Sequence, residues 1–157
     1  MRSDFGFGQT GGGVKVKLLV FEVGSLNAAL HIDVVQRVVN YTTIFGSGLN
    51  PFGVVHLEDK EVTVIDLHKM LFNTPQPLNP KGRKYLLLAR NSVNEVFGIV
   101  ITSPPELYDI PLKAIRVLPA SYRKADTLRI ASHVAVMGEE GEEKTIFILD
   151  PDQLIPQ

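Results

Sequence analysis

The fold is decided by the stretch Val62-Thr63-Val64-Ile65-Asp66-Leu67-His68-Lys69-Met70-Leu71, in which an apolar run reaches an aspartate and passes into helix-compatible residues. Near the end of the chain, Thr145-Ile146-Phe147-Ile148-Leu149-Asp150-Pro151-Asp152-Gln153-Leu154 repeats this pattern. An aspartate before a helical turn predicts an N-cap, because its carboxylate accepts hydrogen bonds from the free amides of the first turn. We therefore interpret Asp66 and Asp150 as structural caps rather than as a catalytic pair of carboxylates.

The repetition extends upstream of both caps. Three early segments match three later ones in the same order: Lys17-Leu18-Leu19-Val20-Phe21 with Lys84-Tyr85-Leu86-Leu87-Leu88, Ser25-Leu26-Asn27 with Ser92-Val93-Asn94, and Leu30-His31-Ile32 with Phe97-Gly98-Ile99. This echo predicts two related β modules in tandem. Such an architecture presents surfaces and carries no catalytic signature.

The boundary between the modules is expected at residues 73–82. This segment contains Pro75, Pro77, Pro80 and Gly82, which disfavour regular pairing. We expect one domain over residues 16–156, divided into modules at 16–72 and 83–156. Residues 1–15, rich in glycine and poor in apolar residues, are expected to form a flexible tail.

Short apolar segments bounded by turn residues predict strands along the whole chain. They fall at residues 18–23, 27–32, 34–39, 53–57, 61–65, 85–89, 96–102, 107–110, 130–137 and 145–149. Their close spacing, with only short helical turns between them, predicts an all-β fold built of small barrels or a sandwich.

The composition narrows the class of protein. The chain has 157 residues, 45% of them hydrophobic, which is enough for a substantial core. The 16 Lys and Arg balance the 17 Asp and Glu, so no broad attraction to nucleic acid or anionic membrane is expected. The absence of cysteine fits the cytoplasm. No apolar stretch approaches the roughly 20 residues needed to insert through a bilayer.

The sequence contains no clear motif for catalysis or metal binding. The four histidines, at positions 31, 56, 68 and 133, lack a short metal-ligand spacing. Gly46-Ser47-Gly48 is too little for a nucleophile elbow, and no Gly-Lys-Ser/Thr follows Gly11-Gly12-Gly13 to make a phosphate loop. We expect no catalytic residue, metal or cofactor. A small β-barrel enzyme stays open as an alternative.

A single-stranded nucleic-acid binder is another alternative, because small barrels also serve that function. Such a site needs aromatic platforms interleaved with basic residues along a groove. Here Phe21, Phe97 and Phe147 fall inside apolar runs and are interpreted as core. Basic residues are scattered among acidic ones, so a solvated surface is favoured over a nucleic-acid face.

An ordered set of motifs resembles a known family. Along the chain these are Leu19-Val20-Phe21, Ala29-Leu30-His31-Ile32, Val35 with Val38, Gly53-Val54-Val55-His56-Leu57, Val62-Thr63-Val64-Ile65-Asp66-Leu67, Phe97-Gly98-Ile99-Val100, Ile115-Arg116 with Pro119, and Ile146-Phe147-Ile148-Leu149-Asp150. Together they resemble the CheW-like chemotaxis coupling domain, from roughly Val16 to Pro156.

The resemblance implies two five-stranded, SH3-like β-barrel modules with a hydrophobic groove between them. It also implies a function without catalysis, in which the protein bridges chemoreceptors to a CheA-type histidine kinase. Partner-binding residues are expected at Val35, Val38, Gly53 and Val55, with core packing as the alternative role for each. Arg37 and Glu58 are expected to set the polarity of that surface.

The chain departs from the family pattern where partners are expected to bind. Where the family usually has Asn-Leu-Arg-Gly, this chain has His56-Leu57-Glu58-Asp59, and where the family has Val-x-Glu-Val/Ile it has Val35-Gln36-Arg37-Val38. One acid has become a base and one base an acid. Two opposite exchanges preserve an attraction if the side chains meet, so we expect Arg37 and Glu58 to face each other on neighbouring strands. The resemblance therefore implies a divergent member with an altered partner surface.

Overall fold

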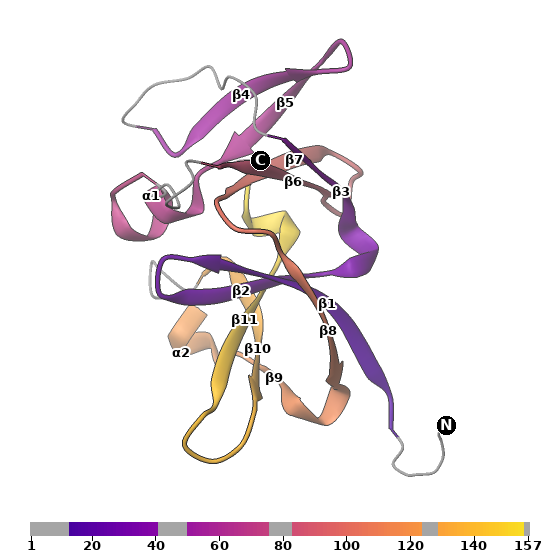
Figure 1. Ribbon diagram of the computed structural model, residues 1–157, viewed down its shortest axis with the longest axis vertical. Helices are drawn as coiled ribbons and strands as arrows, with labels where there is room; N and C mark the ends of the chain where they lie inside the picture. Colours follow the sequence, from indigo (N-terminus) through magenta and orange to yellow (C-terminus); the bar gives the residue numbers. More distant parts are fainter. Residues whose placement is uncertain (1–12, 41–49, 76–82, 124–128, 156–157) are drawn as a thin grey trace.

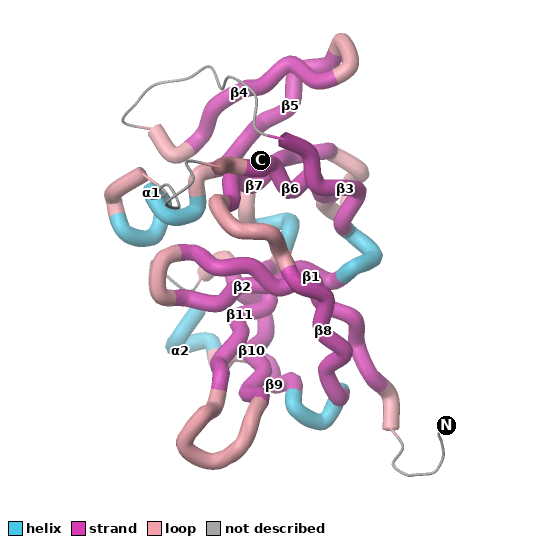
Figure 2. The backbone as a smooth tube through the Cα atoms, viewed as in Figure 1, coloured by secondary structure: helices cyan, strands magenta, loops and turns pink. Residues whose placement is uncertain are grey.

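Two β-sheets lie one above the other in this computed structural model, which describes residues 13–40, 50–75, 83–123 and 129–155 (Figure 1). Each sheet curls into a barrel-like half (Figure 2). The short helical elements sit at the ends of strands: η1 (Ile32–Val34), α1 (Leu67–Phe72), η2 (Leu112–Ala114), α2 (Ala120–Arg123) and η3 (Pro151–Gln153). Within the described residues, no helix has both the length and the apolar content needed to cross a membrane.

The upper sheet in Figure 1, which we call the five-stranded half, has the strand order β3-β6-β7-β5-β4. Its strands are β3 (Val35–Asn40), β4 (Phe52–Leu57), β5 (Lys60–Ile65), β6 (Tyr85–Arg90) and β7 (Val96–Ile101). Strands β4 and β5 are joined by the two residues Glu58 and Asp59, which both have positive φ, 50° and 64°. Positive φ at both positions gives the turn a twist that matches that of the flanking strands.

The lower sheet, which we call the six-stranded half, has the order β8-β1-β2-β11-β10-β9. Its strands are β1 (Lys15–Val23), β2 (Leu26–His31), β8 (Glu106–Pro111), β9 (Ile115–Val117), β10 (Ala131–Met137) and β11 (Lys144–Leu149). The three-residue strand β9 makes this sheet one strand larger than the five expected.

The two sheets repeat one pattern of strand pairing. In the five-stranded half, β7 lies parallel to β5, with Ile99 opposite Ile65. In the six-stranded half, β2 lies parallel to β11, with Ala29 opposite Ile148. Antiparallel partners flank each parallel pair, so β3-β6-β7-β5-β4 corresponds to β8-β1-β2-β11-β10. The predictions of an all-β fold and of two related modules are confirmed.

The expected division of the chain into consecutive modules does not match the sheets. Strands β1 and β2 pair with β8 and β11, whereas β6 and β7 pair with β3 and β5. The five-stranded half, residues 35–101, is therefore inserted between β2 and β8 of the other half. The Pro-rich segment 73–82 connects α1 to β6 within one half and does not separate the two. Of the expected tail, residues 1–12 lie outside the described residues, and Lys15 already begins β1.

Buried apolar side chains form three clusters. One fills the six-stranded half, around Leu18, Val20 and Ile146, and one fills the five-stranded half, around Val55 and Leu86. The largest cluster lies between the halves and takes residues from both sheets and from the end of the chain: Phe21, Val23, Ala28, Leu30, Ile65, Leu67, Leu87, Ala89, Phe97, Ile99, Ile101, Leu118, Ile130, Ala131, Leu149, Leu154 and Ile155. This shared cluster packs the two halves against each other.

Candidate partner-binding surface

The two aspartates that the sequence singled out are hydrogen-bonded as N-caps. Asp66 Oδ1 accepts a hydrogen bond from the Lys69 amide at 3.0 Å, at the start of α1. Asp150 Oδ1 accepts one from the Asp152 amide at 3.0 Å, at the start of η3, where Pro151 takes the first helical position. Both carboxylates thus satisfy backbone amides that a helical turn leaves without intrahelical partners.

Arg37 and Glu58 form an ion pair across the five-stranded half. Arg37 lies on β3 and Glu58 in the turn after β4, and Arg37 Nη2 donates to Glu58 Oε1. The side chains meet as expected, but not from neighbouring strands, because β3 and β4 are the two opposite edges of this sheet. The pair therefore spans the seam between the edges. With 49% and 72% of the two side chains exposed, it contributes at most about 1 kcal/mol to folding.

Strand β3 exposes three consecutive side chains, Gln36, Arg37 and Val38. A register shift between Val35 and Arg37 interrupts the alternation that would otherwise bury every second residue. Val38 is 38% exposed, whereas Val35 is half-buried and packs against the cluster between the halves. The structure thus brings Val38 and the Arg37–Glu58 pair together at one edge of the sheet. In the sequence, the polar pair Gln36-Arg37 stands between apolar pairs, a pattern that fits this exposed segment.

The two expected residues on β4 lie differently. The Val55 side chain is 1% exposed and belongs to the core of the five-stranded half. Its expected contact with a partner is therefore wrong, and the alternative role in packing holds, because alternation along β4 turns this side chain inward. Gly53 is half-buried on the same edge strand.

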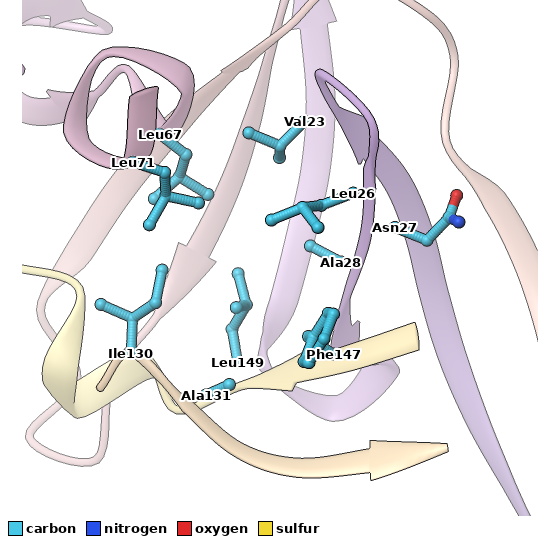
Figure 3. A pocket seen from close by; sticks show the side chains of 10 residues that line it. All are labelled: Val23, Leu26, Asn27, Ala28, Leu67, Leu71, Ile130, Ala131, Phe147 and Leu149. Carbon is cyan, nitrogen blue, oxygen red and sulfur yellow. The ribbon is translucent and has the colours of Figure 1, made fainter. Parts of the chain in front are cut away.

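An apolar pocket lies between the halves, where the family resemblance implied a hydrophobic groove, but the sequence did not predict which residues line it (Figure 3). It has a volume of about 320 Å³, part of which is open to solvent. Its lining comes from four separate regions of the chain: Val23, Leu26, Asn27, Ala28, Leu67, Leu71, Ile130, Ala131, Phe147 and Leu149. No linear motif could reveal a pocket assembled in this way. In Figure 3 the Asn27 amide points away from the apolar side chains.

The pocket lacks the features of an active site. No titratable side chain lines it, whereas ligand sites usually combine an apolar wall with a few convergent polar groups. Elsewhere, Ser132 Oγ lies 2.7 Å from His133 Nδ1, where a register shift in β10 interrupts the alternation of side chains. In the described part of the chain no carboxylate is hydrogen-bonded to this histidine, so the third member of a triad is not in place. Among the described residues, no group of three or more His, Asp or Glu is placed to hold a metal ion.

The fold gives the class of this protein, and a comparison with known proteins gives its family. Two related barrel-like β halves define an all-β class of protein with two modules. The sequence model of the CheW-like domain matches residues 17–157, so the chain belongs to the CheW-like domain family. A comparison with curated protein sequences finds no match.

Among solved structures, the chain is similar to the scaffolding protein TtCheW from Thermoanaerobacter tengcongensis. The TM-score is 0.70 at 19% sequence identity, over 91% of this chain and 89% of that chain. At this identity the likeness shows the fold, two SH3-like modules. The resemblance inferred from the ordered motifs is thereby confirmed.

Proposed function

We propose that this chain is a non-catalytic signalling adaptor of the cytoplasm, which couples chemoreceptor-type sensors to a CheA-type histidine kinase by protein–protein contact. The observation that carries the proposal is the match to the CheW-like domain over residues 17–157, nearly the whole chain. The apolar pocket, without convergent polar groups, supports an adaptor over the alternative of a small enzyme.

The partner-binding surface that we propose lies at the edge of the five-stranded half. It consists of Val35, Arg37 and Val38 on β3, with Glu58 across the seam. Gly53 stays a proposed contact residue on edge strand β4, since a glycine lets another backbone approach closely. Val38 supplies exposed apolar area and the ion pair supplies fixed charges beside it, a combination typical of a small protein-binding surface.

The direct test measures binding of purified CheA-type kinase and of a chemoreceptor signalling fragment by titration calorimetry. Val38→Asp places a charge in the centre of the proposed surface, so we expect the affinity for at least one of these partners to fall about tenfold or more. Val136→Asp is the matched control, because Val136 is 46% exposed on β10 in the other half.

Two outcomes would contradict the proposal. If the parent protein binds neither the kinase nor the receptor fragment, the coupling function is wrong. If it binds and both valine variants weaken binding equally, the coupling function holds and the assignment of the surface to β3 is wrong.

A further inference from the structure

The path of the chain leaves the two halves joined by two short linkers. Because the five-stranded half is inserted into the other, the described chain crosses between the sheets at η1, after β2, and at residues 102–105, after β7. Neither crossing contains a fully buried residue. Pro104 and Pro105 stiffen the second crossing, since a proline ring fixes φ. Bending is therefore possible at η1, where half-buried Val34 packs against the shared cluster, and at the two ends of the stiff second crossing.

The end of the chain adds a third connection, which is not covalent. After β11, Asp150 donates its amide to the Ile130 carbonyl at 2.8 Å, which holds the segment to the six-stranded half. Two residues on, Asp152 Oδ1 accepts a hydrogen bond from the Ser92 amide at 2.8 Å, in the turn between β6 and β7 of the other half. In Figure 1 the yellow turn η3 lies between the two sheets.

Ser92, whose amide donates to Asp152, lies in a turn that is fixed by its own hydrogen bonds. The buried Asn91 accepts hydrogen bonds at Oδ1 from the amides of Val93 at 3.1 Å and Glu95 at 2.9 Å. Its Nδ2 donates to Glu95 Oε1 at 3.1 Å. These bonds fix the turn and leave the Ser92 amide to Asp152. Hydrogen bonds from the amide and the hydroxyl of Ser92 lower the pKa of the Asp152 carboxyl, which is consistent with an ionised acceptor.

Apolar packing completes the connection. Leu154 and Ile155 are both buried in the cluster that the two halves share. On the side of α1 the apolar pocket opens from the same interface to solvent. The two halves are therefore closely packed around Leu154 and Ile155, whereas an apolar pocket separates them where α1 faces β2 and β11. A relative rotation of the halves needs such space on one side and a restraint on the other.

We propose that residues 150–155 act as a C-terminal clasp that sets the angle between the two halves. Releasing the clasp lets the five-stranded half turn about the linkers at η1 and residues 102–105, and this turn changes the width of the apolar pocket. The device belongs to the fold and stands whether or not the protein couples a kinase to receptors.

The test is a distance measurement between the halves by double electron–electron resonance. The chain has no cysteine, so Lys60→Cys and Glu140→Cys place two spin labels without background labelling. Both positions are exposed, one beside the β4–β5 turn and the other in the turn between β10 and β11. The clasp variant combines Asp152→Ala with Ile155→Ala in the full chain. The matched control is Asp109→Ala, which removes a surface pair with Lys17 within one half.

We expect a single narrow distance distribution in the parent and in the control, and a broadened or displaced distribution in the clasp variant. Far-UV circular dichroism identifies any variant that has unfolded, and Asp152→Ala alone then decides the outcome. An unchanged distribution in the clasp variant would overturn the proposal. A distribution that is equally broad in the parent and the control would also overturn it, because the halves would then move with the clasp in place.

Discussion

Asp66 and Asp150 show how a single carboxylate ends a strand and starts a helical turn in both halves. Each accepts a hydrogen bond from an amide of the following turn at 3.0 Å. We expect Asp66→Ala and Asp150→Ala each to lower the free energy of unfolding by about 0.5 to 2 kcal/mol, since an orphan amide loses its acceptor. Urea denaturation measures the change, with Asp109→Ala as a surface control. An unchanged midpoint in both cap variants would show that water replaces the carboxylates at no cost.

The Arg37–Glu58 pair is the second feature that belongs to the residue scale. Because the side chains meet, the double exchange Arg37→Glu with Glu58→Arg keeps one attraction and restores the family's arrangement of charge. We expect the exchanged protein to melt within a few degrees of the parent, since an exposed pair contributes only about 0.2 to 1 kcal/mol.

We also expect the exchanged protein to bind a standard CheA-type kinase or receptor more tightly. Like charges placed opposite each other at a docked surface can cost several kcal/mol. The single variant Arg37→Glu, which leaves two carboxylates across the seam, is the control that separates the pair from a simple change of net charge. Equal affinity of the parent and exchanged proteins would contradict this role of the pair.

At the scale of elements, α1 docks on the turn between β1 and β2 through Gly24. This glycine has φ of 59°, and a Cβ added there would lie 3.1 Å from the His68 ring and 3.1 Å from the Phe72 ring. His68 is held in place by Thr74, whose carbonyl oxygen lies 2.7 Å from His68 Nδ1, and by a tilted contact with Phe72 at 4.8 Å between ring centroids. The helix therefore has little freedom to withdraw from a larger residue.

Gly24→Ala tests this docking. We expect a lower free energy of unfolding, because positive φ alone costs an L-residue about 1 to 2 kcal/mol and the close contacts add to that cost. Gly141→Ala is the matched control, since Gly141 also has positive φ, 89°, but no atom lies within 4 Å of an added Cβ. Thermal denaturation compares the two. A loss at Gly24 no larger than that at Gly141 would show that α1 moves aside freely.

Most elements could be predicted from the sequence, because their signals are local. The alternation and turn residues placed the strands, and the aspartates marked where α1 and η3 begin. The bulge in β3 was not predicted, since the extra residue shows only against the register of β6. For Val55 the sequence left partner contact and core packing open, and the structure shows packing. A motif gives the position of a residue on a strand, but the side that faces the core depends on how β4 is paired and curved.

At the scale of the whole molecule, the repeated sequence segments identified equivalent strands correctly. They did not show which strands pair with one another in a sheet. Neighbours in sequence usually pair, and the tandem interpretation rested on that tendency. Here β2 ends next to β3 in the chain, yet its parallel partner is β11, where Asn27 lies opposite Ile146. No local sequence feature shows whether a strand pairs with the next strands in the chain or with strands that lie beyond an inserted segment. For the same reason the residues that line the pocket and those that form the clasp, which come from distant segments, could be found only in three dimensions.

The insertion of one half into the other has a consequence for the order in which the molecule is made. During synthesis, every strand of the five-stranded half has emerged once Ile101 has been added, so this half can fold early. Strands β1 and β2 emerge first but must wait for β8 and β11 before their sheet is complete. Pairing over so long a separation is slow, because the loop must close before the contact forms. Strands β1 and β2 are thus synthesised first but are among the last to be packed in their sheet. Until then their apolar side chains Leu18 and Val20 are exposed and can contact other chains.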